Sequence, residues 1–438
     1  MKRFLQLLIC VLTVLALTST HLIARGAPEI TESLPSTNLL SPALRNLSSK
    51  VSVRVSSSAG EDALLVYDDF LRALNKRELS GITIKSLPPV AEGELTCKGN
   101  AINTGDALSP ADLSALSISP AGAYITDTEF SFIDNSSLCE YTCRVFWLSS
   151  ANSYPITNVK GVGTFLETYE ELSVHSKLPG YDPDGDSVEY IIVEYPKHGS
   201  VILDKECGEY EYVPKAGFTG SDSFRYVIAD EYGAYAAAQT VNVSIDSVKK
   251  EELFADMSDS FAYAEALSLT REGILSGRSV GGNLIFSPNA QITRGEFVSM
   301  LMACSGTEIK NNVLHTVFYD DDNIHGSIKG AVAAAYELGY ISGTEANGKL
   351  CFFPDEIISR AECARIINNV LGITPPRDHA ILAGAQIEDC PESAVTAVTS
   401  LCSASILPVF DGELNITLPL TREYAAKILW NVKSFSGS

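Results

Sequence analysis

The spacing of apolar and polar residues divides the chain into two kinds of segment. Between residues 51 and 245, short runs alternate between apolar and polar side chains, as at Val51, Val53 and Val55, and Gly, Pro or Asp residues separate the runs. Successive side chains of a β-strand point to opposite faces, so this period of two predicts strands with one buried face. Strands at spacings of roughly 10 residues are typical of an antiparallel sandwich.

Residues 250–438 follow a helical spacing instead, in which apolar residues recur three and four positions apart. The stretches that predict helices are Phe261–Ile274, Glu296–Cys304, Ile328–Leu338, Ala361–Leu371 and Tyr424–Trp430. We therefore expect a multidomain protein, in which two all-β antiparallel sandwich domains are followed by a mainly α-helical unit.

The first residues have the layout of a secretory signal. Lys2 and Arg3 precede an apolar run from Phe4 to Leu17, and this run is shorter than the roughly 20 residues that a membrane-spanning helix needs. Small residues within positions 24–27 offer a cleavage site. We expect an exported protein with no integral membrane segment after cleavage; a retained membrane anchor is the alternative.

The two predicted sandwiches resemble each other in sequence. Each contains a Gly that opens a strand, a Pro in a turn, and an acidic segment that ends on Phe: Gly93, Pro120 and Phe130 in the first copy, and Gly199, Pro214 and Phe224 in the second. We interpret them as two copies of one module, the first more degenerate. The second copy also contains Asp182-Pro-Asp-Gly-Asp186, Pro196-Lys-His-Gly199 and an aromatic run from Tyr210 to Asp230. It resembles the cadherin-like or bacterial immunoglobulin-like repeats of surface proteins.

Internal repetition is stronger in the helical part. Arg294, Arg360 and Arg422 each follow Ser or Thr at the start of a predicted helix, and they lie 66 and 62 residues apart. With the surrounding motifs, this spacing resembles a triplet of S-layer homology (SLH) domains. The resemblance implies a three-pronged, pseudo-threefold unit. It also implies binding of secondary cell-wall polysaccharide, commonly carrying pyruvate ketals, in grooves lined by these arginines. In some diderm bacteria such repeats bind peptidoglycan instead.

Two of the three copies contain a helix-capping box. In such a box, a Ser or Thr hydroxyl accepts a hydrogen bond from the amide three residues later, and the Glu at that position returns a bond. The residues are Thr293 with Glu296 and Ser359 with Glu362. The macrodipole disfavours a cation in the first helical turn, so Arg294 and Arg360 need another explanation. Beside free amide donors they form a site for a carboxylate or phosphate; a surface ion pair with an Asp of the next repeat is the alternative.

The third copy departs from this pattern. Tyr424 stands where Glu belongs, which removes the capping box, and Pro408 replaces a loop glycine. We therefore expect Arg422 to hold the fold without binding the polymer. The aspartates ahead of the helices are expected to serve turns or caps rather than ligands: Asp256, Asp320 and Asp389.

A second constellation lies in the second sandwich. Asp182, Asp184 and Asp186 alternate with Pro and Gly, and three carboxylates at this spacing can converge on Ca²⁺, which prefers hard oxygen ligands. Asp222 and Asp230 are the further ligands if calcium binds. A turn that uses Pro and Gly in their usual roles explains the same residues without a metal, and this interpretation is favoured.

The patterns predict seven segments. These are a signal peptide (1–27), a flexible spacer (28–49), a degenerate cadherin/Ig-like sandwich (50–152), a second such sandwich (153–247), and three SLH repeats (250–310, 311–376 and 377–438).

Composition narrows the choice of partners. The chain has a net charge of −22 and a pI of about 4.7, so it repels nucleic acid and anionic membrane surfaces. Nine cysteines would remain after signal cleavage, at irregular spacings, which is typical of buried free thiols rather than a disulfide framework; one or two disulfides are the alternative.

Nothing in the sequence indicates an enzyme. Its six histidines fall in no metal or triad motif, and it has no Gly-rich phosphate loop and no Gly-x-Ser-x-Gly turn. We expect a non-catalytic cell-wall protein of the S-layer type whose sandwiches act as spacers or bind other surface proteins or glycans. A wall-anchored carbohydrate-active or glycan-binding protein is the alternative, and an exposed row of Trp and Tyr would favour it. The chain has only Trp147 and Trp430.

Overall fold

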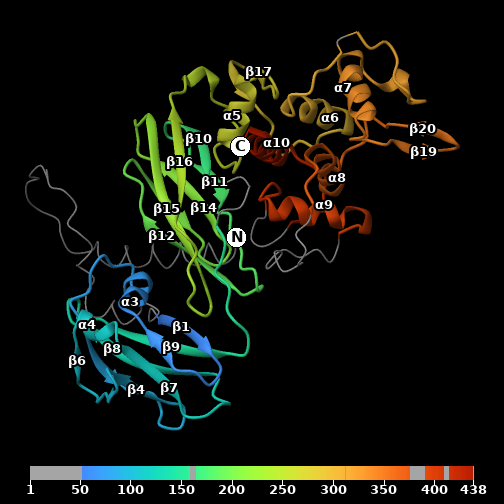
Figure 1. Cartoon of the computed structure of the whole chain (residues 1–438). Helices are drawn as coiled ribbons and strands as arrows, with labels where there is room; N and C mark the ends of the chain where they lie inside the picture. Colours follow the sequence, from blue (N-terminus) through green and yellow to red (C-terminus); the bar gives the residue numbers. More distant parts are fainter. Residues whose placement is uncertain (1–51, 158–163, 311, 375–389, 409–413, 438) are drawn as a thin grey trace, which may run out of the picture. The chain divides into compact units, whose positions relative to one another are not determined.

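Figure 1 shows the computed structural model of the chain, which describes residues 52–157, 164–310, 312–374, 390–408 and 414–437. The predicted signal peptide and spacer lie outside the described residues. In the described part of the chain, no helix combines the length and the apolar composition that crossing a bilayer requires.

The first sandwich consists of two sheets. One has the strand order β1 (Ser52–Ser58), β9 (Glu140–Leu148), β8 (Asp127–Asp134), β3 (Ile82–Ser86) and β6 (Ala107–Leu108). The other has the order β2 (Ala63–Leu65), β7 (Leu116–Pro120), β4 (Gly93–Cys97) and β5 (Asn100–Ala101). Two short helices, α3 (Tyr67–Ala73) and α4 (Pro110–Leu113), belong to the same module. Phe70, Phe130 and Phe132 are almost fully buried between these layers.

The second sandwich also has two sheets, with the order β10 (Phe165–Tyr169), β16 (Gln239–Asp246), β15 (Gly220–Asp230) and β12 (Val188–Glu194) in one. The other has the order β11 (Val174–Lys177), β14 (Glu209–Pro214) and β13 (Gly199–Leu203). The alternation seen in the sequence buries Tyr212, Phe224 and Tyr226 in one core.

The two sandwiches share one topology. The first strand of each pairs in parallel with the last, β1 with β9 and β10 with β16, and the remaining shared strands follow in the same order. Gly93 and Gly199 open equivalent strands because another group occupies the space of a side chain: a Cβ would lie 2.9 Å from Ser119 O and 2.5 Å from the Tyr212 ring. This agreement supports the predicted duplication of one module.

The helical part repeats a unit of helix, connection and helix. The first helices are α5 (Tyr263–Arg271), α7 (Gly326–Glu337) and α9 (Glu392–Ser403), and the second are α6 (Arg294–Cys304), α8 (Arg360–Leu371) and α10 (Arg422–Gly437). Two connections are hairpins, β17 (Arg278–Val280) with β18 (Asn283–Ile285) and β19 (Thr344–Ala346) with β20 (Lys349–Cys351). The short 3₁₀ helices are η1 (Lys250–Glu252) and η2 (Asp321–Asn323). Helix α10 contacts α5, α6 and α8, so the third copy belongs to the same core (Figure 1).

Candidate functional site

The three helical repeats close into a ring through their backbones. The amide of Ile358 donates to Ile292 O at 3.1 Å, that of Leu420 to Ile358 O at 2.9 Å, and that of Ile292 to Leu420 O at 3.0 Å. These residues stand at equivalent positions, so each repeat donates to the one before it and the third closes onto the first. This closed set of bonds gives the pseudo-threefold arrangement that the SLH resemblance implies.

Each second helix begins against the next repeat in the ring. The amide of Arg294 donates to Glu356 O at 2.8 Å, that of Arg360 to Leu418 O at 3.0 Å, and that of Arg422 to Ala290 O at 2.9 Å. The following amides donate to the same neighbours: Gly295 to Pro354 O, Ala361 to Ile416 O, and Glu423 to Pro288 O. The expectation that free helix amides lie beside the arginines is therefore wrong, because the ring itself uses these donors.

The predicted capping boxes are present in the first two repeats. Thr293 Oγ1 accepts from the Glu296 amide at 3.3 Å, and the Glu296 carboxylate accepts from the Thr293 amide at 2.9 Å. Ser359 and Glu362 form the same pair of bonds at 3.2 and 3.1 Å. The third repeat keeps only the first half, since the Tyr424 amide donates to the Thr421 hydroxyl.

The guanidinium groups of the three arginines reach equivalent carbonyls in the next repeat. Arg294 Nη1 donates to Phe352 O at 2.9 Å, Arg360 Nη1 to Leu414 O at 3.0 Å, and Arg422 Nε to Phe286 O at 2.8 Å. The accepting residues are 66 and 62 residues apart, as the arginines are. All three arginines are half-buried, and each marks one seam between repeats.

At the first seam, two carboxylates balance the charge of the arginine. Arg294 Nη2 lies 2.9 Å from a carboxylate oxygen of Glu362 and 3.1 Å from one of Glu356. Burial raises the pKa of Glu362. The hydrogen bond from the Ser359 amide and the nearby Arg294 charge lower this pKa by more than burial raises it, so the net shift is downward. The capping glutamate of the second repeat is therefore also the counter-ion of the first arginine.

The other two seams lack this match among the described residues. At the second seam, Tyr424 and Leu418 replace the two glutamates, and the Arg360 guanidinium carbon lies 3.9 Å from the centre of the Tyr424 ring. Arg360 Nε is buried and has no hydrogen-bond partner among the described residues. No described carboxylate forms an ion pair with Arg360, and the described groups that face its guanidinium are the Leu414 carbonyl and the Tyr424 ring.

At the third seam, Arg422 lies 4.5 Å from the centre of the Phe286 ring and donates from Nη2 to Ser276 O at 2.7 Å. The equivalent glutamate is Glu296, which forms no ion pair with Arg422 in the described structure but acts on its charge from a distance. No Asp among the described residues forms an ion pair with Arg294, Arg360 or Arg422, so the alternative of an ion pair with an Asp of the next repeat is not seen in that part of the chain. Asp256 and Asp320 instead accept from backbone amides of their own repeats at 2.7–2.8 Å, which is the predicted turn role. Asp389 lies outside the described residues.

Sequence reasoning missed the residues that face the arginines. Glu356, Leu414 and Tyr424 lie in the repeat that follows each arginine, and their role depends on closure of the ring. The constant spacing of 66 and 62 residues is the signal that would have identified equivalent positions, but not which repeat each arginine contacts.

The acidic turn of the second sandwich is arranged differently from the prediction. Asp182 and Asp186 lie together, and their third neighbour is Asp230 at the end of β15. Asp184 is not part of this group, because its carboxylate accepts from the Ser153 amide at 2.6 Å and the Ser153 hydroxyl at 3.0 Å. Asp222 is not part of it either: it accepts from the amides of Lys197 and His198 at 3.0 and 2.8 Å.

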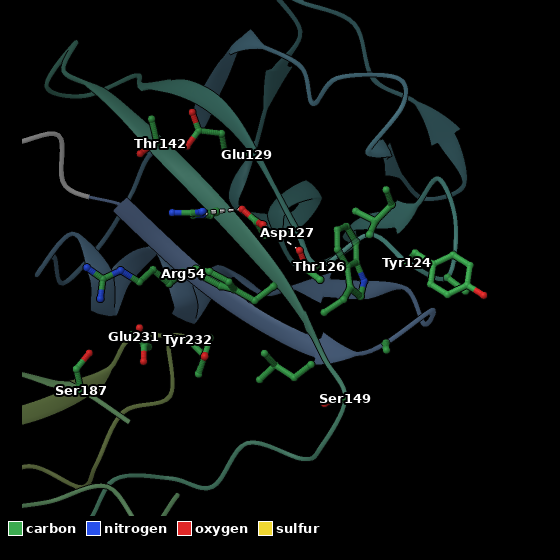
Figure 2. Close-up of a pocket in the computed structure, with 17 residues that line it drawn as sticks. Arg54, Tyr124, Thr126, Asp127, Glu129, Thr142, Ser149, Ser187, Glu231 and Tyr232 are labelled. Carbon is green, nitrogen blue, oxygen red and sulfur yellow. Dashed lines mark hydrogen bonds and ion pairs between the residues drawn. The ribbon is translucent and has the colours of Figure 1, made fainter. Parts of the chain in front are cut away.

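A depression beside the first sandwich has a polar lining. Figure 2 shows Asp127, Glu129 and Thr142 on strands β8 and β9, and Arg144 lies 2.7 Å from Asp127. Tyr124 is exposed near this edge, but Trp147 is 3% exposed and donates from Nε1 to Glu61 O at 2.8 Å. Trp430 is also buried. Both tryptophans therefore serve cores, and they form no exposed aromatic row of the kind that glycan binding would favour.

Comparison with known families identifies two kinds of domain. The S-layer homology domain matches residues 253–298 and 317–364, and the bacterial Ig domain matches residues 152–244. A "Surface-layer 125 kDa protein" of Lysinibacillus sphaericus is 29% identical over 184 residues, which are 41% of this chain and 15% of that protein. The chain thus spans a small part of the length of this relative.

Solved structures that align with the chain include fibronectin(III)-like modules of Clostridium thermocellum CbhA and Drosophila N-cadherin EC1-3. The first is 15% identical, covering 45% of this chain and 91% of that chain with a TM-score of 0.21. The second is 13% identical, covering 44% and 63% with a TM-score of 0.21.

The matched SLH segments end before α9 and α10. The third repeat nevertheless completes the ring of backbone hydrogen bonds, through Leu420 in the first set and Arg422 in the second. The chain therefore carries a bacterial Ig domain followed by S-layer homology domains, and this content indicates a protein held at the cell wall on the cell surface.

Proposed function

We propose that the three repeats hold the protein non-covalently on the cell wall by binding an anionic secondary cell-wall polysaccharide. The observation that carries this proposal is the set of half-buried arginines at the three seams, of which Arg360 and Arg422 have no ion-pair partner among the described residues. A guanidinium presents five N–H donors in a plane that matches a carboxylate or a phosphate. An anionic sugar at a seam would supply the missing charge.

The three seams should not contribute equally to binding of the polymer. Arg294 is already paired with Glu356 and Glu362, so an incoming anion would have to compete with two carboxylates. Arg360 faces an aromatic ring instead. We therefore assign the largest share of binding to Arg360, and we assign Arg294 a role in joining repeats as well as a share of the polymer contact. Thr293, Glu296, Ser359 and Glu362 support the site by starting the helices that carry the arginines.

We further propose that the sandwiches act as a non-catalytic spacer or adhesive part. The buried aromatic side chains of the sandwiches pack in their cores. The ion pair between Arg144 and Asp127 lies at the surface, where such pairs contribute little to stability. Other surface proteins or glycans are the partners that such modules would contact.

The polymer is identified by the wall fraction that the full chain binds. The chain should sediment with wall sacculi, and it should remain in solution after the non-peptidoglycan polymer has been stripped from them. Equal sedimentation with stripped sacculi would assign the repeats to peptidoglycan, and failure to sediment with either preparation would refute wall binding.

A further inference from the structure

One strand edge is covered in the first sandwich and open in the second. Strand β4 of the first copy lies between β7 and β5, whereas its equivalent β13 ends its sheet, with β14 on one side and no described strand on the other. The connection after β4, residues 98–115, contains β5, but the connection after β13, residues 204–208, contains no strand. The second copy therefore lacks the element that covers this edge in the first.

The ladder between β13 and β14 determines which backbone groups face the open edge. The Asp204 amide donates to Glu209 O at 2.8 Å just past the end of β13. Hydrogen-bonded pairs alternate along an antiparallel ladder, so Ser200 and Ile202 direct their backbone groups to β14. The residues between and beside them direct their amides and carbonyls away from β14, and these are Gly199, Val201 and Leu203.

Strand β13 also lacks the features that usually protect an edge. An open edge is a template for another strand, and proteins commonly block it with charged residues, proline or a bulge. Strand β10 contains Glu167, β11 contains Lys177, and β12 contains Glu189, Glu194 and a shift in register. Strand β13 reads Gly-Ser-Val-Ile-Leu and has none of these, while its Ile202 is 57% exposed. Its composition is that of a strand that pairs with another.

The charges on the two sides of β13 have opposite signs. Lys197 precedes the strand, and Asp204 and Glu206 follow it. Lys205 also follows it, but this side chain lies 3.8 Å from the Glu189 carboxylate, which offsets its charge. Two copies of the strand related by a twofold axis run antiparallel, so the basic side of each copy meets the acidic side of the other. This complementarity favours a second copy of the same chain as the partner.

We propose that β13 pairs antiparallel with β13 of a second copy of this chain, about a twofold axis at Val201. Gly199 of each copy then lies opposite Leu203 of the other, and each of these pairs exchanges two backbone hydrogen bonds, as does the pair at the axis. On the exposed face, Ile202 of each copy lies opposite Ser200 of the other. The two sheets join into one across this contact.

The contact is weak between free chains. A strand of five residues buries far less than the roughly 1,200–2,000 Å² of a stable interface, and the net charge of −22 makes the copies repel each other. Chains held side by side on one surface would meet at a higher effective concentration. The contact uses the second sandwich alone, so it can be measured on free chains and does not depend on the proposed wall binding.

The test is disulfide crosslinking of the chain without its predicted signal, at high concentration and in enough salt to screen the net charge. Ser200→Cys and Ile202→Cys chains are mixed and mildly oxidised. Residues opposite each other in a non-hydrogen-bonded pair have Cα atoms about 4.5 Å apart, which a disulfide can span. Identical positions lie on a diagonal of about 7–8 Å, which is too far. The mixture should form several times more linked dimer than either variant alone, and peptide mapping should place the bond between positions 200 and 202.

Glu94→Cys mixed with Thr96→Cys is the matched control, because these are the equivalent positions of β4, whose edge β5 covers. This mixture should form no more linked dimer than the wild type, whose own cysteines set the background. Val201→Pro, added to both variants of the first mixture, should reduce the linked dimer, because proline lacks the amide that the pair at the axis exchanges. An edge strand tolerates proline, and melting curves verify that the variant is folded.

Three results would overturn the proposal. In the first, the mixture of Ser200→Cys and Ile202→Cys forms no more linked dimer than the single variants or the control mixture. In the second, each variant links to itself as readily as to the other, which would indicate a parallel or nonspecific contact. In the third, either variant links within one chain to a native cysteine, which would assign the open edge to a segment of the same chain.

Discussion

The first and second seams of the helical ring have the same backbone and different electrostatics. In both, the arginine amide donates to a carbonyl of the next repeat and its guanidinium donates to another. At the first seam, Glu356 and Glu362 then neutralise Arg294. At the second, Leu418 and Tyr424 stand at the same places and leave the Arg360 charge without a described carboxylate.

The difference separates two roles that a repeated arginine can have. A half-buried arginine with two carboxylate partners joins repeats, since removing it leaves those charges facing each other. One that is held by a carbonyl and a ring face keeps its charge available to an anionic ligand. Tyr424, which stands in place of the capping glutamate of the third repeat, is thus also the residue that faces Arg360 at the second seam.

The largest effect on binding should come from Arg360→Ala. A hydrogen bond between a charged group and the polymer contributes roughly 1.5–3 kcal/mol, so its loss should weaken binding about tenfold or more at about 1.4 kcal/mol per decade. The stability cost should stay near 1 kcal/mol, the value of about one hydrogen bond. Polymer-binding isotherms and melting curves measured on the same preparation test this balance, and normal affinity would remove Arg360 from the site.

Arg294→Ala should show the opposite balance. Arg294 donates to Phe352 O and lies beside two carboxylates. Its loss should therefore lower the free energy of unfolding by about 1–3 kcal/mol, as for removal of a charged hydrogen-bond partner. The folded variant should lose less affinity than Arg360→Ala. If the two variants lost affinity equally at unchanged stability, the two seams would be equivalent and the contrast wrong.

Thr293→Ala removes a helix cap without touching a guanidinium. Ser or Thr to Ala at such a position costs about 1 kcal/mol, so the melting temperature should fall while polymer affinity changes little. Ser359→Ala is the matched variant at the second seam. A loss of affinity larger than the loss of stability in either variant would place the hydroxyl in the binding site.

Glu362→Gln should have the smallest effect on stability and makes the first seam resemble the second. Glutamine keeps the capping box but not the charge that balances Arg294. Because the folded pKa of Glu362 lies below its ordinary value of 4.5, its charge contributes stability above that value, and this contribution is lost as the pH falls through the folded pKa. The variant should lack this acid-dependent component in melting curves, and it should bind the polymer no more weakly than the wild type.

The helix starts could be predicted from the sequence because their interactions are local. Thr293 with Glu296 and Ser359 with Glu362 satisfy each other within one turn, so a motif of four residues is sufficient. The partners of the arginines lie 54 to 146 residues away, and they follow from the closure of the ring. The prediction of free amide donors failed for this reason, since the neighbouring repeat uses the amides.

The acidic turn illustrates the same limit. The sequence places Asp184 beside Asp182 and Asp186, but the Asp182 carboxylate bonds to the Asp184 and Asp186 amides while the Asp184 side chain reaches Ser153. The third member of the group, Asp230, is the last residue of β15, which pairs with β12. Sequence reasoning named Asp230 only as a secondary ligand, because strand register decides which carboxylates meet.

The most direct test of the account is to divide the chain and ask which part binds the wall. The fragment 250–438, with its helical content verified by circular dichroism, should sediment with sacculi as fully as the chain without its predicted signal, because all three seams lie within it. The fragment 50–247 should remain in solution. Sedimentation of the 50–247 fragment, with a folded 250–438 fragment left in the supernatant, would contradict the assignment of wall anchoring to the repeats.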